Sequence, residues 1–206
     1  MDLINSFEVG RSIDETWAAL TNVENVVPCL PGARLQAVDD GEYRGVVKVR
    51  FGRITTEFAG AARIAEQNAT DYKIVVHGHG LDAQGEGNAE AFVTAKLEPI
   101  NDTTTRVLVD TDLTLTGRVA QLSRGVIPEV SANLMAQFAE NLAEMLDRAE
   151  SVSPGVTDET EARRRRIIEM PEPEAIDLME AARSSVLKRV VAILLLAAAV
   201  RWWLRR

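Results

Sequence analysis

The sequence predicts an α+β fold in which a curved antiparallel sheet packs against one long C-terminal helix. Three observations predict it: successive segments alternate apolar and polar residues, turn-forming residues separate them, and a late segment repeats an apolar residue every three or four positions. Alternation with period two is typical of strands with one solvated face, and the longer spacing is typical of an amphipathic helix. Since short connections join the strands, we expect an antiparallel meander.

Chain length and charge limit the class of protein. The 206 residues are 46% apolar and 26% charged, which suits one domain with a core and an appendage. Residues 1–150 hold 13 basic and 23 acidic side chains, whereas residues 183–206 hold six basic and no acidic ones. An acidic body repels phosphate backbones, so we expect no nucleic-acid binding, and only the basic terminus suits an anionic surface.

Cysteine usage indicates the compartment. Cys29 is the single cysteine, so no disulfide forms within the chain. A lone thiol in a chain without an apolar N-terminal leader predicts a reducing, cytoplasmic setting. Because Cys29 follows Pro28, we expect it to be part of the buried packing and not a reactive thiol.

The first elements are a strand and a capped helix. Ser12 is a predicted N-cap, and Glu15 three positions later completes a capping box. Pro28 and the Pro31-Gly32 pair predict turns after this helix. The strand carries Leu3, Phe7 and Val9, and the helix carries Trp17 and Leu20.

Five further strands follow, with turn-rich breaks at Gly52, 68–70, 85–88 and Asn101. Their alternation places large apolar residues on one face and leaves the other face in water. The alternating positions are Tyr43, Val47, Val49 and Phe51; Ile54, Thr56, Phe58 and Ile64; Tyr72, Ile74 and Val76; Ala89, Ala91, Val93 and Leu97; and Val107, Val109, Leu113 and Leu115.

The final helix is the strongest secondary-structure signal. Its single apolar stripe has to be buried, so we expect the helix to lie across the concave face of the sheet. Pro128 either bends this helix or marks a break within it, because proline removes one backbone donor. The stripe comprises Val119, Leu122, Val126, Val130, Leu134, Phe138, Leu142 and Met145.

Several short motifs appear in an order that resembles one family. They are Trp17, the Pro31-Gly32 turn, the Val-Arg-Phe-Gly-Arg-Ile strand pair, Phe58-x-Gly60, the Gly/Ala-rich segment 78–91 and the Gly-Arg-Val-Ala-Gln-Leu segment from Gly117. Over residues 1 to about 148 the chain resembles the carbon monoxide dehydrogenase CoxG family of the START-like (SRPBCC) superfamily. The resemblance implies a helix-grip fold, with residues 1–150 as a START-like domain.

Small residues at inward positions raise the question of a cavity. They are Gly45, Gly60, Ala62, Ala89, Ala91 and Ala95, and small residues opposite a helix leave room. The resemblance implies that this room binds an apolar small molecule, while a filled core stays the alternative because alternation does not report volume. The expected lining is Val49, Phe51, Phe58, Val93, Leu113, Leu122, Val126 and Leu134.

Candidate catalytic and metal-binding residues are few. His77 and His79 share one strand face, and a metal site there needs a third ligand such as Asp82 or Glu86. Solvated histidines on the outer face are the better supported interpretation, because the apolar residues of that strand occupy the inner face. We expect no enzyme activity, since the chain offers no nucleophile paired with a base.

Asp110 and Asp112 also share a face, and two carboxylates on one face are one arrangement that supports catalysis. They alternate with apolar residues, so a solvated face is favoured over a catalytic dyad.

A tether and a cationic apolar tail follow the body. Residues 151–185 are expected to form a flexible tether, in which 176–183 is a candidate short helix and the run 163–166 is either a solvated charge cluster or a contact with a membrane or partner. In the tail, 186–206, the uncharged stretch 190–200 gives about 16 Å of helix against a hydrocarbon core of about 30 Å. One-leaflet or tilted insertion is therefore favoured over a relaxed span. The expected membrane-binding residues are Lys188, Arg189, Leu194, Leu195, Leu196, Arg201, Trp202, Trp203, Arg205 and Arg206.

The resemblance implies partnership with a molybdenum hydroxylase of the carbon monoxide dehydrogenase type. We expect a non-enzymatic protein at the cytoplasmic face of the cell membrane that recruits this enzyme and binds a quinone or lipid, with no covalent cofactor. The alternative is a START-like enzyme or cyclase acting on an aromatic substrate in the cavity. A buried titratable pair in that cavity favours the alternative.

Overall fold

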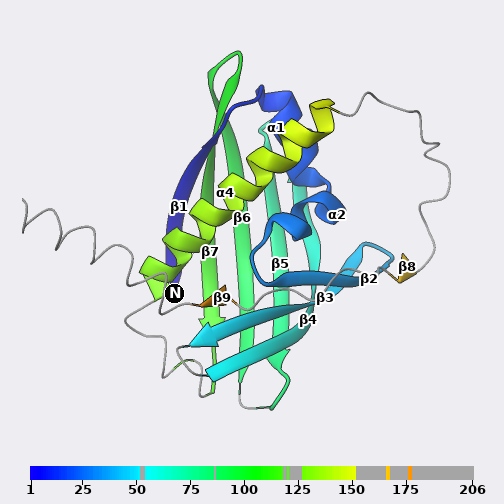
Figure 1. Cartoon of the computed structure of the whole chain (residues 1–206), viewed down its shortest axis with the longest axis vertical. Coiled ribbons are helices and arrows are strands. Elements are labelled where there is room, and N and C mark those ends of the chain that lie inside the picture. The colour runs from blue at the N-terminus through cyan, green and yellow to red at the C-terminus, as the bar shows by residue number, and fades with distance from the viewer. Residues whose placement is uncertain are drawn as a thin grey trace, which may run out of the picture.

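The computed structural model describes residues 1–51, 54–85, 87–117, 120, 127–151, 166–167 and 176–177. In this part of the chain, seven long strands form one antiparallel sheet in the spatial order β1-β7-β6-β5-β4-β3-β2 (Figure 1). The predicted meander is confirmed for six of them, and the N-terminal strand closes the far edge by pairing with β7. The strands are β1 (Asp2–Val9), β2 (Ala33–Asp39), β3 (Glu42–Phe51), β4 (Ile54–Asn68), β5 (Lys73–Asp82), β6 (Asn88–Asn101) and β7 (Thr104–Leu115).

The connection between β1 and β2 carries α1 (Ile13–Thr21), α2 (Val23–Val26) and a short 3-10 helix, η1 (Val27–Cys29). The predicted capping box at α1 is confirmed. The Glu15 backbone N–H donates to the Ser12 hydroxyl at 3.4 Å, and the Ser12 backbone N–H donates to the Glu15 carboxylate at 3.0 Å. Hydrogen bonds to its carboxylate, first the one from the Ser12 hydroxyl, lower the pKa of Glu15, and the box satisfies free amides of the first turn.

The long helix α4 (Ile127–Ser151) crosses the concave side of the sheet, as its apolar stripe predicted (Figure 1). Pro128 lies in its first turn, where a missing backbone donor loses no helical hydrogen bond. Ser131 accepts a hydrogen bond from Asn5 of β1 at 2.8 Å, and Asp147 pairs with Arg11 at 2.6 Å. Polar contacts therefore fix both ends of α4 to the body. Val119, Leu122 and Val126 of the predicted stripe lie outside the described residues.

A packed core occupies the end of the sheet beneath the C-terminal half of α4. Leu142 is fully buried, and the Phe138 ring meets Phe7 edge-on at 5.5 Å. Cys29 exposes only 2% of its surface, and burial raises the pKa of its thiol, so its prediction as a packing residue is confirmed. The core consists of Phe7, Val9, Ala19, Cys29, Leu97, Val107, Val109, Phe138 and Leu142.

The strand β2 was not predicted, because its alternation is broken. The pairing between β2 and β3 shifts register between Leu35 and Ala37, which moves the later residues to the opposite phase. A two-residue turn then joins the two strands. Asp40 and Gly41 both have positive φ, 47° and 79°, as a type I′ hairpin turn requires.

Two very short strands lie within the segment predicted as a tether. β8 (Arg166–Ile167) pairs antiparallel with β2, and β9 (Ile176–Asp177) pairs parallel with β3. The first two residues of the candidate short helix are therefore extended. The boundaries of the tether and tail stay predictions, because the tail 186–206 lies outside the described residues. In the part of the chain that is described, no helix is both long enough and apolar enough to span a bilayer.

Candidate functional site

The inward face of the sheet is almost free of charge. Strand register assigns each residue to a face, since directly paired residues lie on the same side. Along the described strands, Asp82 is the one inward position that carries a charge at neutral pH. Asp82 is buried at the end of β5, beside Phe58. The predicted outward placement of Asp110 and Asp112 is confirmed, and both are exposed.

The inward face divides into a filled end and an end with small side chains. Toward the filled end, Val93 packs against the core cluster. Toward the other end, one row of paired positions crosses β3 to β7, and all of its members stay partly exposed although they face inward. This row, the small-residue row, consists of Tyr43, Ala62, Gly78, Ala91 and Leu113.

The next inward row contains glycines for a different reason. A Cβ on Gly45 would lie 2.4 Å from the Arg34 carbonyl oxygen, and a Cβ on Gly60 would lie 1.9 Å from the carbonyl oxygen of His79. At these two positions glycine is needed because the neighbouring backbone approaches closely, where the sheet bends. Gly78 differs, since its nearest contact would be the Ala62 Cβ at an ordinary 3.9 Å. The small inward residues thus serve both sheet curvature and interior space.

The structure places the predicted lining residues on the inward face without gathering all of them. Phe58 is buried outside the core cluster, and Val49, Leu113 and Leu134 are half-buried. The side chain of Phe51, together with Leu122 and Val126, lies outside what the structure describes. The cavity and its lining therefore stay a prediction, which the proposal below develops.

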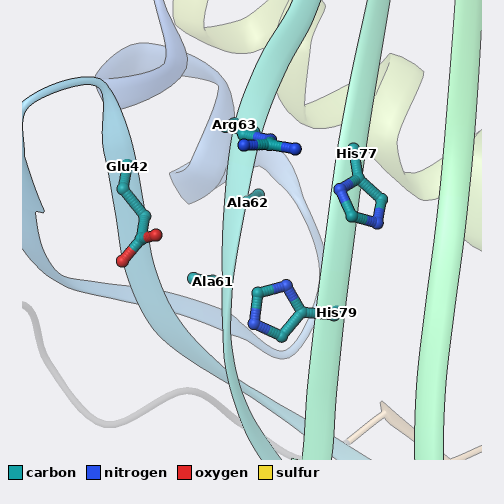
Figure 2. Close-up of a pocket in the computed structure, with 6 residues that line it drawn as sticks. All are labelled: Glu42, Ala61, Ala62, Arg63, His77 and His79. Atoms are coloured by element: carbon teal, nitrogen blue, oxygen red, sulfur yellow. The ribbon is translucent and has the colours of Figure 1, made fainter.

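A hollow of about 190 Å³ opens instead on the outward face, across β3, β4 and β5. Register explains it: Ala61 lies between the large side chains of Arg44 and His79 in one outward row, so the row has a gap. The hollow is lined by Glu42, Ala61, Ala62, Arg63, His77 and His79 (Figure 2). Sequence analysis singled out the two histidines but not Arg63 or Glu42, which only strand register brings beside them.

The outward placement of His77 and His79 is confirmed, but His77 is more enclosed than a solvated side chain. It exposes 17% of its side chain, stacks on Phe92 with ring centroids 4.3 Å apart, and lies 2.9 Å from a Glu90 carboxylate oxygen. A metal site with Asp82 as third ligand is wrong, because Asp82 faces inward. Among the described residues no group of three metal-ligating side chains is arranged to hold a metal, and Glu86 lies outside them.

Comparison with known families decides the relationship. The profile of the carbon monoxide dehydrogenase CoxG family matches residues 6–147. The chain belongs to the CoxG family. The matched range coincides with β1 to α4, so the family match covers the sheet, the core and the inward face together. A comparison with curated protein sequences found no match.

Solved structures confirm the fold. A conserved protein from Geobacillus kaustophilus superposes with a TM-score of 0.62 at 19% identity, covering 72% of this chain and 97% of that protein. A protein from Thermus thermophilus gives 0.54 at 12% identity, with 72% and 99% covered. Norcoclaurine synthase from Thalictrum flavum, in complex with dopamine and hydroxybenzaldehyde, gives 0.50 at 13% identity, with 72% and 87% covered. The expected helix-grip, START-like fold is confirmed.

Proposed function

We propose that this member of the CoxG family is a non-enzymatic carrier that binds a quinone or lipid and recruits a molybdenum hydroxylase of the carbon monoxide dehydrogenase type to the cytoplasmic face of the membrane. The observation that carries the proposal is the small-residue row, which is apolar, partly exposed and outside the packed core.

The chemistry of this row suits an apolar ligand. Each Å² of apolar surface removed from water contributes about 25 cal/mol, so a ring or acyl chain covering Ala91 and Leu113 binds by area alone. Inward Val47 is 40% exposed and extends the same apolar surface toward β3. A binding surface of this kind discriminates by shape and needs few polar groups.

Electron flow gives such a carrier its place. A hydroxylase that oxidises its substrate releases two electrons, and a quinone that takes them up with two protons becomes a quinol. A soluble enzyme needs its quinone delivered, because quinones reside in the membrane. A membrane-tethered domain that holds the quinone supplies both the location and the electron acceptor.

One observation favours the enzymatic alternative, a START-like enzyme or cyclase. Asp82 is a buried inward carboxyl group with 6% exposure, and the norcoclaurine synthase structure shows two aromatic molecules bound by a protein of this fold. Turnover of an aromatic substrate by the full chain that is lost in Asp82→Asn supports the enzyme. A chain that binds the same aromatic without turnover supports the carrier.

Replacing Ala91 with tryptophan is expected to block ligand uptake. The indole would fill the space over the small-residue row, so binding of a fluorescent quinone analogue should fall at least tenfold. The matched control is Thr114→Trp, on the neighbouring strand but on the outward, exposed face. Equal quinone binding by wild type and a folded Ala91→Trp variant would remove the cavity from the proposal.

Membrane attachment is expected to reside in residues 186–206. Replacing Leu194, Leu195 and Leu196 with serine should abolish cosedimentation with anionic liposomes, because the apolar stretch provides the insertion energy. High salt should weaken wild-type binding without abolishing it, since salt screens only the contribution of the six basic residues from Arg183 onward. Cosedimentation of the triple variant at the wild-type level contradicts this assignment.

Recruitment is tested by flotation. Liposomes loaded with the full-length chain should carry a purified hydroxylase of this type to the top of a density gradient, and bare liposomes should not. A hydroxylase that stays at the bottom in both cases contradicts the recruiting role and leaves the carrier role to the quinone assay.

A further inference from the structure

The outward hollow has a chemistry that the apolar carrier does not use. His77, His79 and Arg63 converge on it from two neighbouring strands, with Ala61 as its floor. Figure 2 shows the His79 ring reaching from β5 toward Ala61 of β4, and the Arg63 side chain turned toward β5. Three nitrogen-bearing side chains therefore face a space of about 190 Å³, which is large enough for a small ligand group.

Arg63 is unusual among the basic residues of the sheet. It has neither a hydrogen bond nor an ion pair with any described residue, and apart from Arg34 the other basic strand residues with described side chains are engaged. A guanidinium left open beside two imidazoles lacks the anion that such groups normally bind. The ion pairs of the other basic strand residues are Arg44 with Glu42, Lys73 with Glu66, Lys96 with Glu98, and Arg106 with Glu8.

The local charge depends on the histidines. On the three strands that form the hollow and on the adjoining β6, the fixed charges near it are Arg44 and Arg63 against Glu42 and Glu90, and these cancel. Histidine is the side chain that gains a proton most readily between pH 8 and pH 5. Protonation of both imidazoles gives the hollow a local net charge of +2, although the surrounding body is acidic.

We propose that this outward hollow binds a phosphate group, with Arg63 as the principal donor and His77 and His79 as proton-dependent donors. A phosphate offers acceptor oxygens in several directions, which matches three donors arriving from two strands better than a planar carboxylate does. Glu42 at the rim accepts a hydrogen bond from the protonated form of the phosphate or from the group that carries it. Nothing in this site depends on the apolar inward face.

The test is isothermal titration of the full-length chain with orthophosphate and with sulfate at pH 6 and pH 8. Sulfate keeps its charge across this range, so a change in its affinity reports protonation of the protein alone. We expect saturable binding of both anions at pH 6, and at least tenfold weaker sulfate binding at pH 8. The His77→Gln/His79→Gln double variant should lose the pH dependence of sulfate binding.

Two substitutions decide whether the hollow is the site. Arg63→Gln should weaken binding of both anions at least tenfold at either pH. Arg106→Gln is the matched control, because Arg106 lies on the outward face of β7 and pairs with Glu8 away from the hollow. The proposal is overturned by an absence of saturable binding at pH 6, or by equal affinities in wild type and a folded Arg63→Gln variant.

Two sources of the phosphate are distinguished with phosphatidylglycerol vesicles and soluble glycerol phosphate. A lipid headgroup as the ligand predicts that Arg63→Gln weakens vesicle cosedimentation severalfold while the tail is unchanged. A soluble phosphate ester predicts equal cosedimentation and a loss of glycerol phosphate binding in the variant. A variant that retains wild-type behaviour in both assays overturns the proposal.

Discussion

Replacing Gly60 with alanine is expected to lower the free energy of unfolding by about 3 kcal/mol or more. The added Cβ would lie 1.9 Å from the His79 carbonyl oxygen and 2.6 Å from the Gly80 Cα. Both atoms belong to the backbone of β5, so relief requires the two strands to separate and no side chain can move aside. In a chain of this size we expect the melting temperature to fall by about 6 to 12 °C.

Gly78→Ala is the matched control on the neighbouring strand. Its Cβ would meet Ala62 at 3.9 Å, an ordinary contact, and alanine reduces the entropy of the unfolded chain. We expect a change within about 0.5 kcal/mol. Thermal unfolding followed by circular dichroism measures both variants, and equal melting temperatures for them would show that the sheet bends elsewhere.

Leu142→Ala is expected to cost about 2 to 5 kcal/mol in unfolding free energy, because this side chain is fully buried in the core beneath α4. The same substitution at Leu134, two turns earlier on the helix, should cost about 1 kcal/mol, since Leu134 is half-buried and outside the core cluster. Urea unfolding of the two variants measures the difference.

The two leucines should also separate stability from ligand binding. We expect Leu134→Ala to weaken quinone-analogue binding severalfold and Leu142→Ala to leave it near wild type in the folded protein. Similar losses of stability at both positions would mean that the core extends along the whole helix, and that the inward face has no free end.

The periodicity of the sequence predicted most of the fold, and the errors have physical causes. Alternation located β1 and β3 to β7 because each strand keeps one apolar face over many residues. The strand β2 was missed since the bulge between Leu35 and Ala37 interrupts its phase. The glycines at 45 and 60 were interpreted only as space for a ligand, because sequence does not show how closely a neighbouring backbone approaches.

The candidate site was predictable only in part. That His77 and His79 face outward follows from the apolar residues that alternate with them on the same strand. The neighbours of these histidines do not follow, because Arg63 and His77 become partners through a register that shifts between Ile64 and Glu66. Pair contacts across strands depend on such bulges, and a shift of one residue moves a side chain to the other face.

The pairing of β1 with β7 has a consequence for biosynthesis. Glu8 and Arg106 form an ion pair although they lie 98 positions apart, and the whole of β1 pairs only with β7. While the nascent chain emerges, β1 has no partner strand until nearly the entire sheet has left the ribosome. Contacts of such large sequence separation slow folding, so we expect the closing of this edge to limit the folding rate.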